Sequence, residues 1–192
     1  MYHFIVYLHL VALILAFFAT GLVVAGALAL RRADRVDDAR FALGLAALAA
    51  KFHPIAALGL LATGAYLTQT AWSWNTPWIL CGVIGLVIVA IMGAGVLGSR
   101  ERAMLNMLRD TPDGPILAPL RERLDDPVSD VGGPAISIFV LGIAFLMVMK
   151  PDLLGSILTL AIAALLGIGA GMGARAGASK SARAAYAGAA EG

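Results

Sequence analysis

The sequence predicts an all-α fold, a polytopic transmembrane bundle with five spans, its N-terminus outside and its C-terminus inside. Apolar residues make up 60% of the 192 residues, and the mean hydropathy is +0.89, whereas the apolar fraction of a soluble domain is nearer half. Five apolar stretches suit the roughly 20 helical residues that a hydrocarbon core of about 30 Å requires. The predicted spans are 4–30, 43–67, 78–97, 134–149 and 153–174.

The basic residues predict the orientation. Twelve of the fourteen lie on one side of the five spans: Arg31, Arg32, Arg35, Arg40, Arg100, Arg102, Arg109, Arg121, Arg123, Arg175, Lys180 and Arg183. Cytoplasmic loops retain Lys and Arg, and interfacial aromatic residues mark membrane boundaries; here Trp72, Trp74 and Trp78 lie at the opposite side. We therefore expect a multi-pass protein of the bacterial cytoplasmic membrane. The net charge of only +2 gives no indication of a nucleic-acid partner.

The first span is expected to remain as an anchor. No basic residue precedes it, and Arg31 and Arg32 follow it directly. A cleavable signal peptide has the reverse arrangement, with its charge before a shorter apolar core.

The second span allows two interpretations, because Lys51, His53 and Pro54 interrupt its apolar pattern. Either one kinked helix runs from about residue 38 to residue 66, or a short surface helix ends near Lys51 and Pro54 opens the span. We favour the continuous helix, since Ala and Leu dominate residues 41–50 and neighbouring groups can satisfy the carbonyl that a proline frees.

The third span opens at Trp78, and the fourth and fifth form an antiparallel hairpin. Pro134 suits the first turn of a helix, where a missing amide proton costs nothing. Lys150 and Pro151 close the fourth span, and only residues 150–152 separate it from the fifth.

A polar loop at 99–133 and a tail at 176–192 complete the single membrane domain, residues 1–175. In the loop, Met104, Leu105 and Leu108 lie opposite Arg102 and Arg109 at helical spacing. This pattern predicts a helix that lies flat on the inner membrane surface. The Ala- and Gly-rich tail is predicted to be flexible or a fraying extension of the fifth span.

Small residues on the fifth span indicate close helix packing. Gly167 with Gly171, and Gly169 with Gly173, form two overlapping Gly-x-x-x-Gly pairs. In lipid, such residues bring two backbones together. The pairs predict packing within the bundle or, as the alternative, a homodimer face.

Two histidines could provide axial ligands for a b-type haem, whose iron accepts imidazole. These are His9 in the first span and His53 in the second. With about 1.5 Å of rise per residue, His9 lies roughly 8 Å below a boundary at Phe4, and His53 some 20 Å below one at Leu67. This difference in depth argues against one iron between them. The alternative is that both are ordinary interior histidines.

A second set of side chains lies toward the outer half of the spans and suits Cu(I), which prefers thiolate, thioether and imidazole ligands. The set comprises His3, His9, Cys81, Met147 and Met149. Met147 and Met149 are two residues apart on a helix and therefore point in different directions. The alternative is that the methionines face lipid or pack between helices.

Several short motifs resemble a family of small bacterial integral membrane proteins of unknown function. They are Tyr7-Leu8-His9, residues 61–67 with Thr63-Gly64, Trp78, and residues 145–151. That family is similar to copper-resistance D-like proteins and, more distantly, to four-helix membrane protoporphyrinogen oxidases. The resemblance covers residues 1–151 and implies a helical bundle. It also implies that His9 corresponds to a haem-ligating histidine, whereas the oxidase lysine has no match except Lys51.

The sequence thus predicts an integral membrane protein of unknown biochemical role, either non-catalytic or an accessory subunit. No carboxylate lies within a predicted span, which argues against the usual ion relay of a secondary transporter. The alternatives are a haem-binding or redox protein that uses His9, and a copper-handling transporter.

Overall fold

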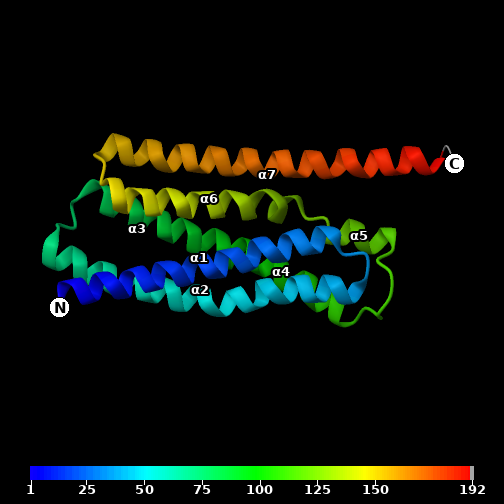
Figure 1. The fold of residues 1–192 in the computed structure, drawn as a ribbon, viewed down its shortest axis with the longest axis horizontal. Helices are drawn as coiled ribbons and strands as arrows, with labels where there is room; N and C mark the ends of the chain where they lie inside the picture. Colours follow the sequence, from blue (N-terminus) through cyan, green and yellow to red (C-terminus); the bar gives the residue numbers. More distant parts are fainter. Residues whose placement is uncertain (191–192) are drawn as a thin grey trace.

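The computed structural model describes the backbone of residues 1–190 and the side chains of residues 1–177. Its elements are α1 (Tyr2–Arg32), α2 (Val36–Ala71), α3 (Pro77–Ala90), the π-helix η1 (Ile91–Leu97), α4 (Gly98–Arg109), α5 (Ala118–Leu124), α6 (Pro127–Met149) and α7 (Leu153–Ala190). The long helices run side by side along one axis (Figure 1).

Five helices in the described part of the chain are long and apolar enough to cross a membrane, which confirms the all-α five-span fold. Helix α6 begins at Pro127, before the predicted start of the fourth span, and Asp126 caps it by accepting a hydrogen bond from the backbone N–H of Val128. Helix α7 continues past the predicted end of the fifth span to Ala190. The backbone of the tail is therefore a helical extension as far as that residue.

Helix α2 is continuous and contains Pro54, so the prediction of one long helix is confirmed. A proline inside a helix removes one hydrogen bond and leaves the carbonyl four residues earlier without its usual partner. The helix persists because one of its faces is buried along its length, from Val36 to Thr68.

The segment 100–109 does not lie flat on a membrane surface, and that prediction is wrong. Helices α3, η1 and α4 follow one another without a break. The apolar face of α4 is buried against α2, where Leu108 is fully enclosed and Met104 nearly so. Helical spacing correctly identified an amphipathic helix, but its apolar side covers protein rather than lipid.

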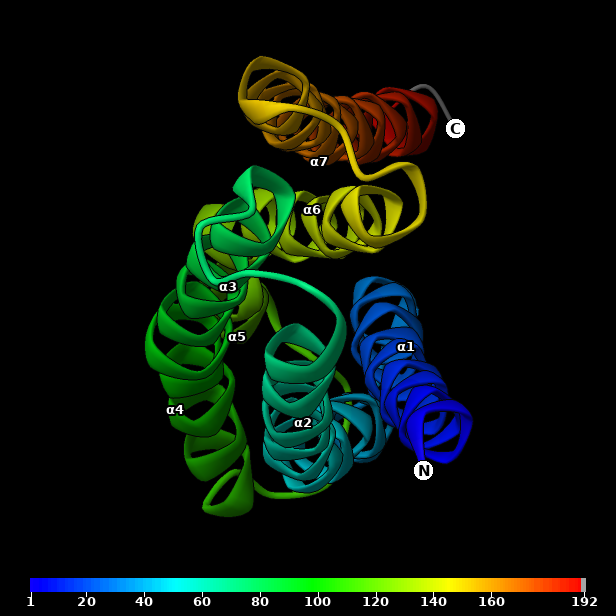
Figure 2. The ribbon, with the colours of Figure 1, turned by 90° about the vertical axis from the view of Figure 1, so that its left-hand side faces the viewer.

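Two antiparallel hairpins, α1–α2 and α6–α7, make up most of the bundle. The continuous α3–η1–α4 helix joins them, because α3 packs on α6 whereas α4 packs on α2. The view along the bundle shows α6 and α7 as one pair and α1 and α2 as another, with α3 and α4 alongside both (Figure 2).

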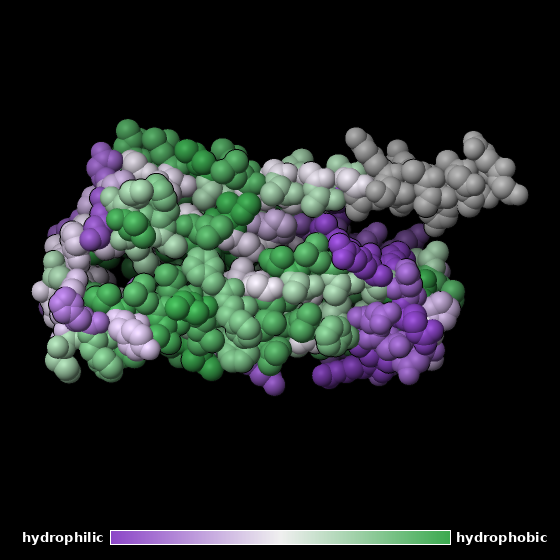
Figure 3. Space-filling model, in the orientation of Figure 1, coloured by the Kyte–Doolittle hydropathy of each residue, from purple (hydrophilic) through white to green (hydrophobic). Residues whose placement is uncertain are grey.

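The two ends of the bundle differ in chemistry. We call the end with residues 72–76 and 150–152 the tryptophan end, and the end with residues 33–35 and 110–126 the arginine end. A broad hydrophobic band lies between them, and hydrophilic residues gather at both (Figure 3). Such a band is the surface expected of a protein that is embedded in a bilayer.

Candidate functional site

Helices α1 and α2 meet along a seam of small residues that recur every seven positions. The buried set comprises Ala12, Ala19 and Gly26 on α1 and Ala42, Ala49 and Ala56 on α2. A seven-residue repeat keeps one helical face against its partner. The backbones touch, since a Cβ on Gly26 would lie 2.6 Å from the carbonyl oxygen of Ala42.

The register of this seam places His9 beside Thr63. Farther along, Phe18 meets Phe52 edge to face. His53 follows Phe52 and lies ten residues, about 15 Å of helix, from Thr63. The structure therefore places His9 and His53 at different levels along the bundle, in agreement with the difference in depth predicted from the sequence.

The ring of His9 is held on two sides by α2. Its Nδ1 lies 2.8 Å from Oγ1 of Thr63, and that oxygen lies 2.5 Å from the carbonyl oxygen of Gly59. A Cβ on Gly64 would lie 3.4 Å from Cε1 of the ring. The absence of a side chain at Gly64 thus leaves room for the imidazole, and Thr63 sets its direction.

The second ring nitrogen of His9, Nε2, is not fully enclosed by the protein. Among the described residues, Nε2 has no hydrogen-bond partner, and no buried side-chain nitrogen or oxygen there lacks one. Nε2 is therefore not fully buried. An imidazole nitrogen in this position can accept a metal or a hydrogen bond from outside the chain.

The other predicted ligands are not gathered around His9. His3 is exposed and its ring meets that of Tyr2, while Cys81 is buried on α3. Met147 is half-buried and Met149 is exposed, so they face different sides of α6. Within the part of the chain that the structure describes, no three His, Cys, Asp or Glu side chains form a group suited to a metal ion.

The glycines of α7 divide into two faces. A Cβ on Gly167 would lie 2.6 Å from Cα of Ala135, and one on Gly171 would lie 2.7 Å from Cα of Val131. This pair packs on α6 and is not free for a second chain, which corrects half of the predicted homodimer face. A Cβ on Gly169 or Gly173 would meet nothing within 4 Å.

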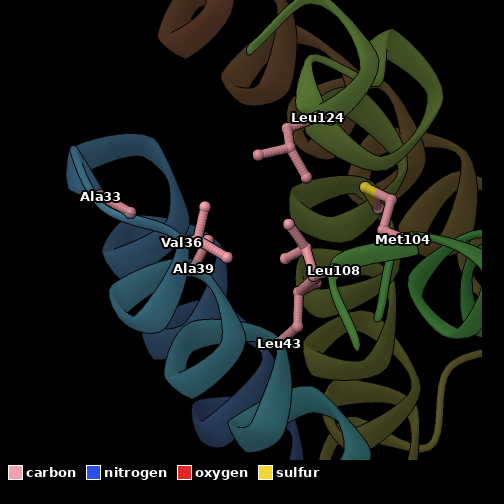
Figure 4. Close-up of a cluster of buried hydrophobic side chains, with 7 residues drawn as sticks. All are labelled: Ala33, Val36, Ala39, Leu43, Met104, Leu108 and Leu124. Carbon is pink, nitrogen blue, oxygen red and sulfur yellow. The ribbon is translucent and has the colours of Figure 1, made fainter. Parts of the chain in front are cut away.

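The arginine end has a hydrophobic core of its own. Its buried side chains are Ala33, Val36, Ala39, Leu43, Met104, Leu108 and Leu124. They converge from the α1–α2 turn, from the first turns of α2, from α4 and from α5 (Figure 4). Two arginines bind backbone carbonyls around this core. Arg40 donates to the carbonyl oxygens of Leu108 and Thr111, and Arg121 donates to those of Leu30 and Ala33.

Carboxylates at the start of α6 bind arginines from three other helices. Asp130 lies 3.0 Å from Arg31 and 3.1 Å from Arg175, and Asp126 lies 2.9 Å from Arg100. Partial burial acts to raise the pKa of Asp126, but hydrogen bonds from Ser129 and Val128 and the charge of Arg100 hold that pKa below its ordinary value. These ion pairs place α1, α4 and α7 around the first turns of α6.

A small cavity of about 30 Å³ lies between α2 and α4 at this end and contains one carboxylate, that of Glu101. Alanines of α2 form the opposite wall. Sequence reasoning did not identify Glu101, because nothing in the local pattern shows that α4 packs on α2.

A family model matches most of this chain. The family model described as "Predicted integral membrane protein (DUF2269)" matches residues 3–151. The comparison with curated proteins and that with solved structures found no match. The matched region includes His9, Thr63 and Gly64 and ends before α7 begins.

Proposed function

This chain belongs to the family of predicted integral membrane proteins (DUF2269), and we propose that it holds a b-type haem through Nε2 of His9. The proposal depends on one observation, that Nε2 is not fully buried and has no hydrogen-bond partner among the described residues. In an apolar setting a polar atom without a partner costs free energy, so a ligand for it stabilises the protein. Imidazole is the usual axial ligand of haem iron.

The residues around His9 fit such a group as a one-histidine site. Bound haem would supply one-electron redox chemistry. This chain provides the imidazole and the hydroxyl of Thr63 that orients it, beside a seam of small apolar residues. His53 is not part of the site, because it lies about three helical turns away along α2.

The proposed relation to copper-resistance D-like proteins and, more distantly, to membrane protoporphyrinogen oxidases adds support, since it would make His9 correspond to the haem-ligating histidine of the oxidases. We propose an accessory role rather than catalysis, because the match to the oxidase lysine is limited to Lys51. Lys51 is exposed on α2 and takes no part in the seam.

Absorption spectroscopy tests the haem proposal. Protein expressed with added haem is expected to show a Soret band that His9→Gln abolishes and that His3→Gln and His53→Gln retain. A Soret band unchanged in His9→Gln would overturn the assignment. Copper that survives dialysis and is lost in Met147→Leu would instead support the copper-binding set.

We also propose that the arginine end faces the cytoplasm of a bacterial cell. Arginines follow α1 and border α4 and α5, and three tryptophans lie near the opposite end. Compartment-sensitive reporters at Asp152 and beyond residue 183 are expected to report opposite compartments. The same compartment at both positions would refute this orientation.

For self-association we propose the face of α7 that carries Gly169 and Gly173. Its support is the open space at both positions, whereas Gly167 and Gly171 are in contact with α6. Gly173→Leu is expected to reduce cross-linking between copies in membranes, and unchanged cross-linking would exclude this face.

A further inference from the structure

We infer that Thr63 is a positioning residue, which holds neutral His9 with its proton on Nδ1 and so leaves the lone pair on Nε2. This inference concerns the protein without any ligand. The use of Nε2 as a haem ligand rests on the proposed function. Only the tautomer with a bare Nε2 can bind a metal at that atom.

The first step is the short contact between Thr63 and its own helix. Oγ1 of Thr63 lies 2.5 Å from the carbonyl oxygen of Gly59, within the range of a strong O–H···O hydrogen bond. A carbonyl carries no proton, so two oxygens this close require the hydroxyl proton between them. The carbonyl oxygen of Leu60 is farther away, at 3.4 Å. Thr63 therefore donates to Gly59.

The second step considers which atom supplies the proton of the hydrogen bond between Thr63 and His9. A hydroxyl has one proton to donate, and that of Thr63 is already used, so toward His9 its oxygen can only accept. Nδ1 lies 2.8 Å from this oxygen and must carry the proton of the hydrogen bond. A neutral imidazole has a single N–H, which leaves Nε2 as the acceptor nitrogen.

The third step excludes the doubly protonated ring. A charged group inside a membrane span is unfavourable on insertion scales. No carboxylate contacts His9 in the described part of the chain. Metal-binding histidines commonly donate their other N–H to an oxygen acceptor, which fixes the ring and its tautomer. The hydroxyl of Thr63 occupies that position here.

Nitrogen NMR of the haem-free protein tests the tautomer directly. With ¹⁵N-labelled histidine, protonated and bare ring nitrogens resonate in separate ranges, and couplings to the ring protons identify each nitrogen. The signals of His9 are those lost in His9→Gln. We expect Nδ1 protonated in the wild type and in Thr63→Ser, and a shift toward Nε2 protonation in Thr63→Val.

Thr68→Val is the matched control. Thr68 is buried on the same helix and donates to the carbonyl oxygen of Gly64 at 2.9 Å, but it has no imidazole partner. The Thr68→Val substitution removes the same kind of intrahelical hydrogen bond as Thr63→Val. We expect it to leave the signals of His9 unchanged. A wild-type His9 protonated on Nε2, or a Thr63→Val protein that keeps the proton on Nδ1, would overturn the inference.

Haem binding gives a second readout. Loss of such a hydrogen-bond partner typically lowers metal affinity roughly 10- to 100-fold, and we expect this loss in Thr63→Val, with recovery in Thr63→Ser. If the wild type shows no Soret band, the proposed function fails, whereas the NMR result still decides the tautomer. If haem binds but the tautomer is wrong, only the role of Thr63 fails.

Discussion

The arginine end and the tryptophan end of the bundle are held together by different interactions. At the arginine end, seven buried side chains form a core, and arginines bind backbone carbonyls and carboxylates around it. At the tryptophan end, Trp72 meets Trp78 edge to face, and Nζ of Lys150 lies 4.7 Å from the centre of the Trp72 ring. The first end resembles a small water-soluble domain, and the second resembles a membrane interface.

The difference shows where the two hairpins are joined. Asp126 and Asp130, at the start of α6, bind arginines of α1, α4 and α7. His9 lies in the first third of α1, toward the tryptophan end. The proposed ligand site is thus separated from the strongest polar contacts, so substitutions at one end are expected to leave the other unchanged.

The largest effect is expected from Leu108→Ala, which leaves a cavity in the core of the arginine end. Leu108 is fully buried, and such a truncation typically costs about 2–5 kcal/mol. The free energy of unfolding in detergent is the measurement. Leu117→Ala is the control, because that side chain is 66% exposed. Equal losses in both variants would show that this end has no packed core.

The next effect is expected where α7 meets α6 beside Asp130. A Cβ on Gly171 would lie 2.7 Å from Cα and 2.9 Å from the carbonyl oxygen of Val131, so Gly171→Ala should destabilise by about 1–3 kcal/mol through overpacking. Gly169→Ala, with open space around it, should be neutral or stabilising by up to about 1 kcal/mol. Thermal unfolding of the two variants distinguishes them, and a reversed order would contradict the packing.

Sequence reasoning predicted the five spans because apolar length is a local property that can be read directly. It also predicted the separation of His9 from His53, since helical rise converts residue number into depth. It did not predict the core around Leu108 or the pairing of Asp130 with Arg31 and Arg175. Those contacts join residues about 45 to 99 positions apart, and no local pattern encodes which helices are neighbours.

A smaller effect is expected from acid at the arginine end. The pKa of Asp126 is depressed in the folded protein, so its stabilising contribution is complete above the ordinary value of 3.8 and is lost as the pH falls below that value. Unfolding followed between neutral and acidic pH should therefore show a decline that Asp126→Asn reduces. Asp110→Asn, at an exposed carboxylate of the same end, is the comparison. An identical acid profile in wild type and Asp126→Asn would contradict the assignment.

The smallest effect is expected at the tryptophan end, from Lys150→Asn. Lys150 ends α6 with a φ of 50°, a conformation that asparagine tolerates, so this substitution removes the charge without adding backbone strain. An exposed cation–π contact contributes about 0.5–1 kcal/mol, and the free energy of unfolding should fall by no more than that. Lys150→Arg keeps the cation over the Trp72 ring and should retain the stability. A loss as large as that of Leu108→Ala would contradict this comparison. It would mean that Lys150 contributes as much stability at the tryptophan end as the buried core does at the arginine end.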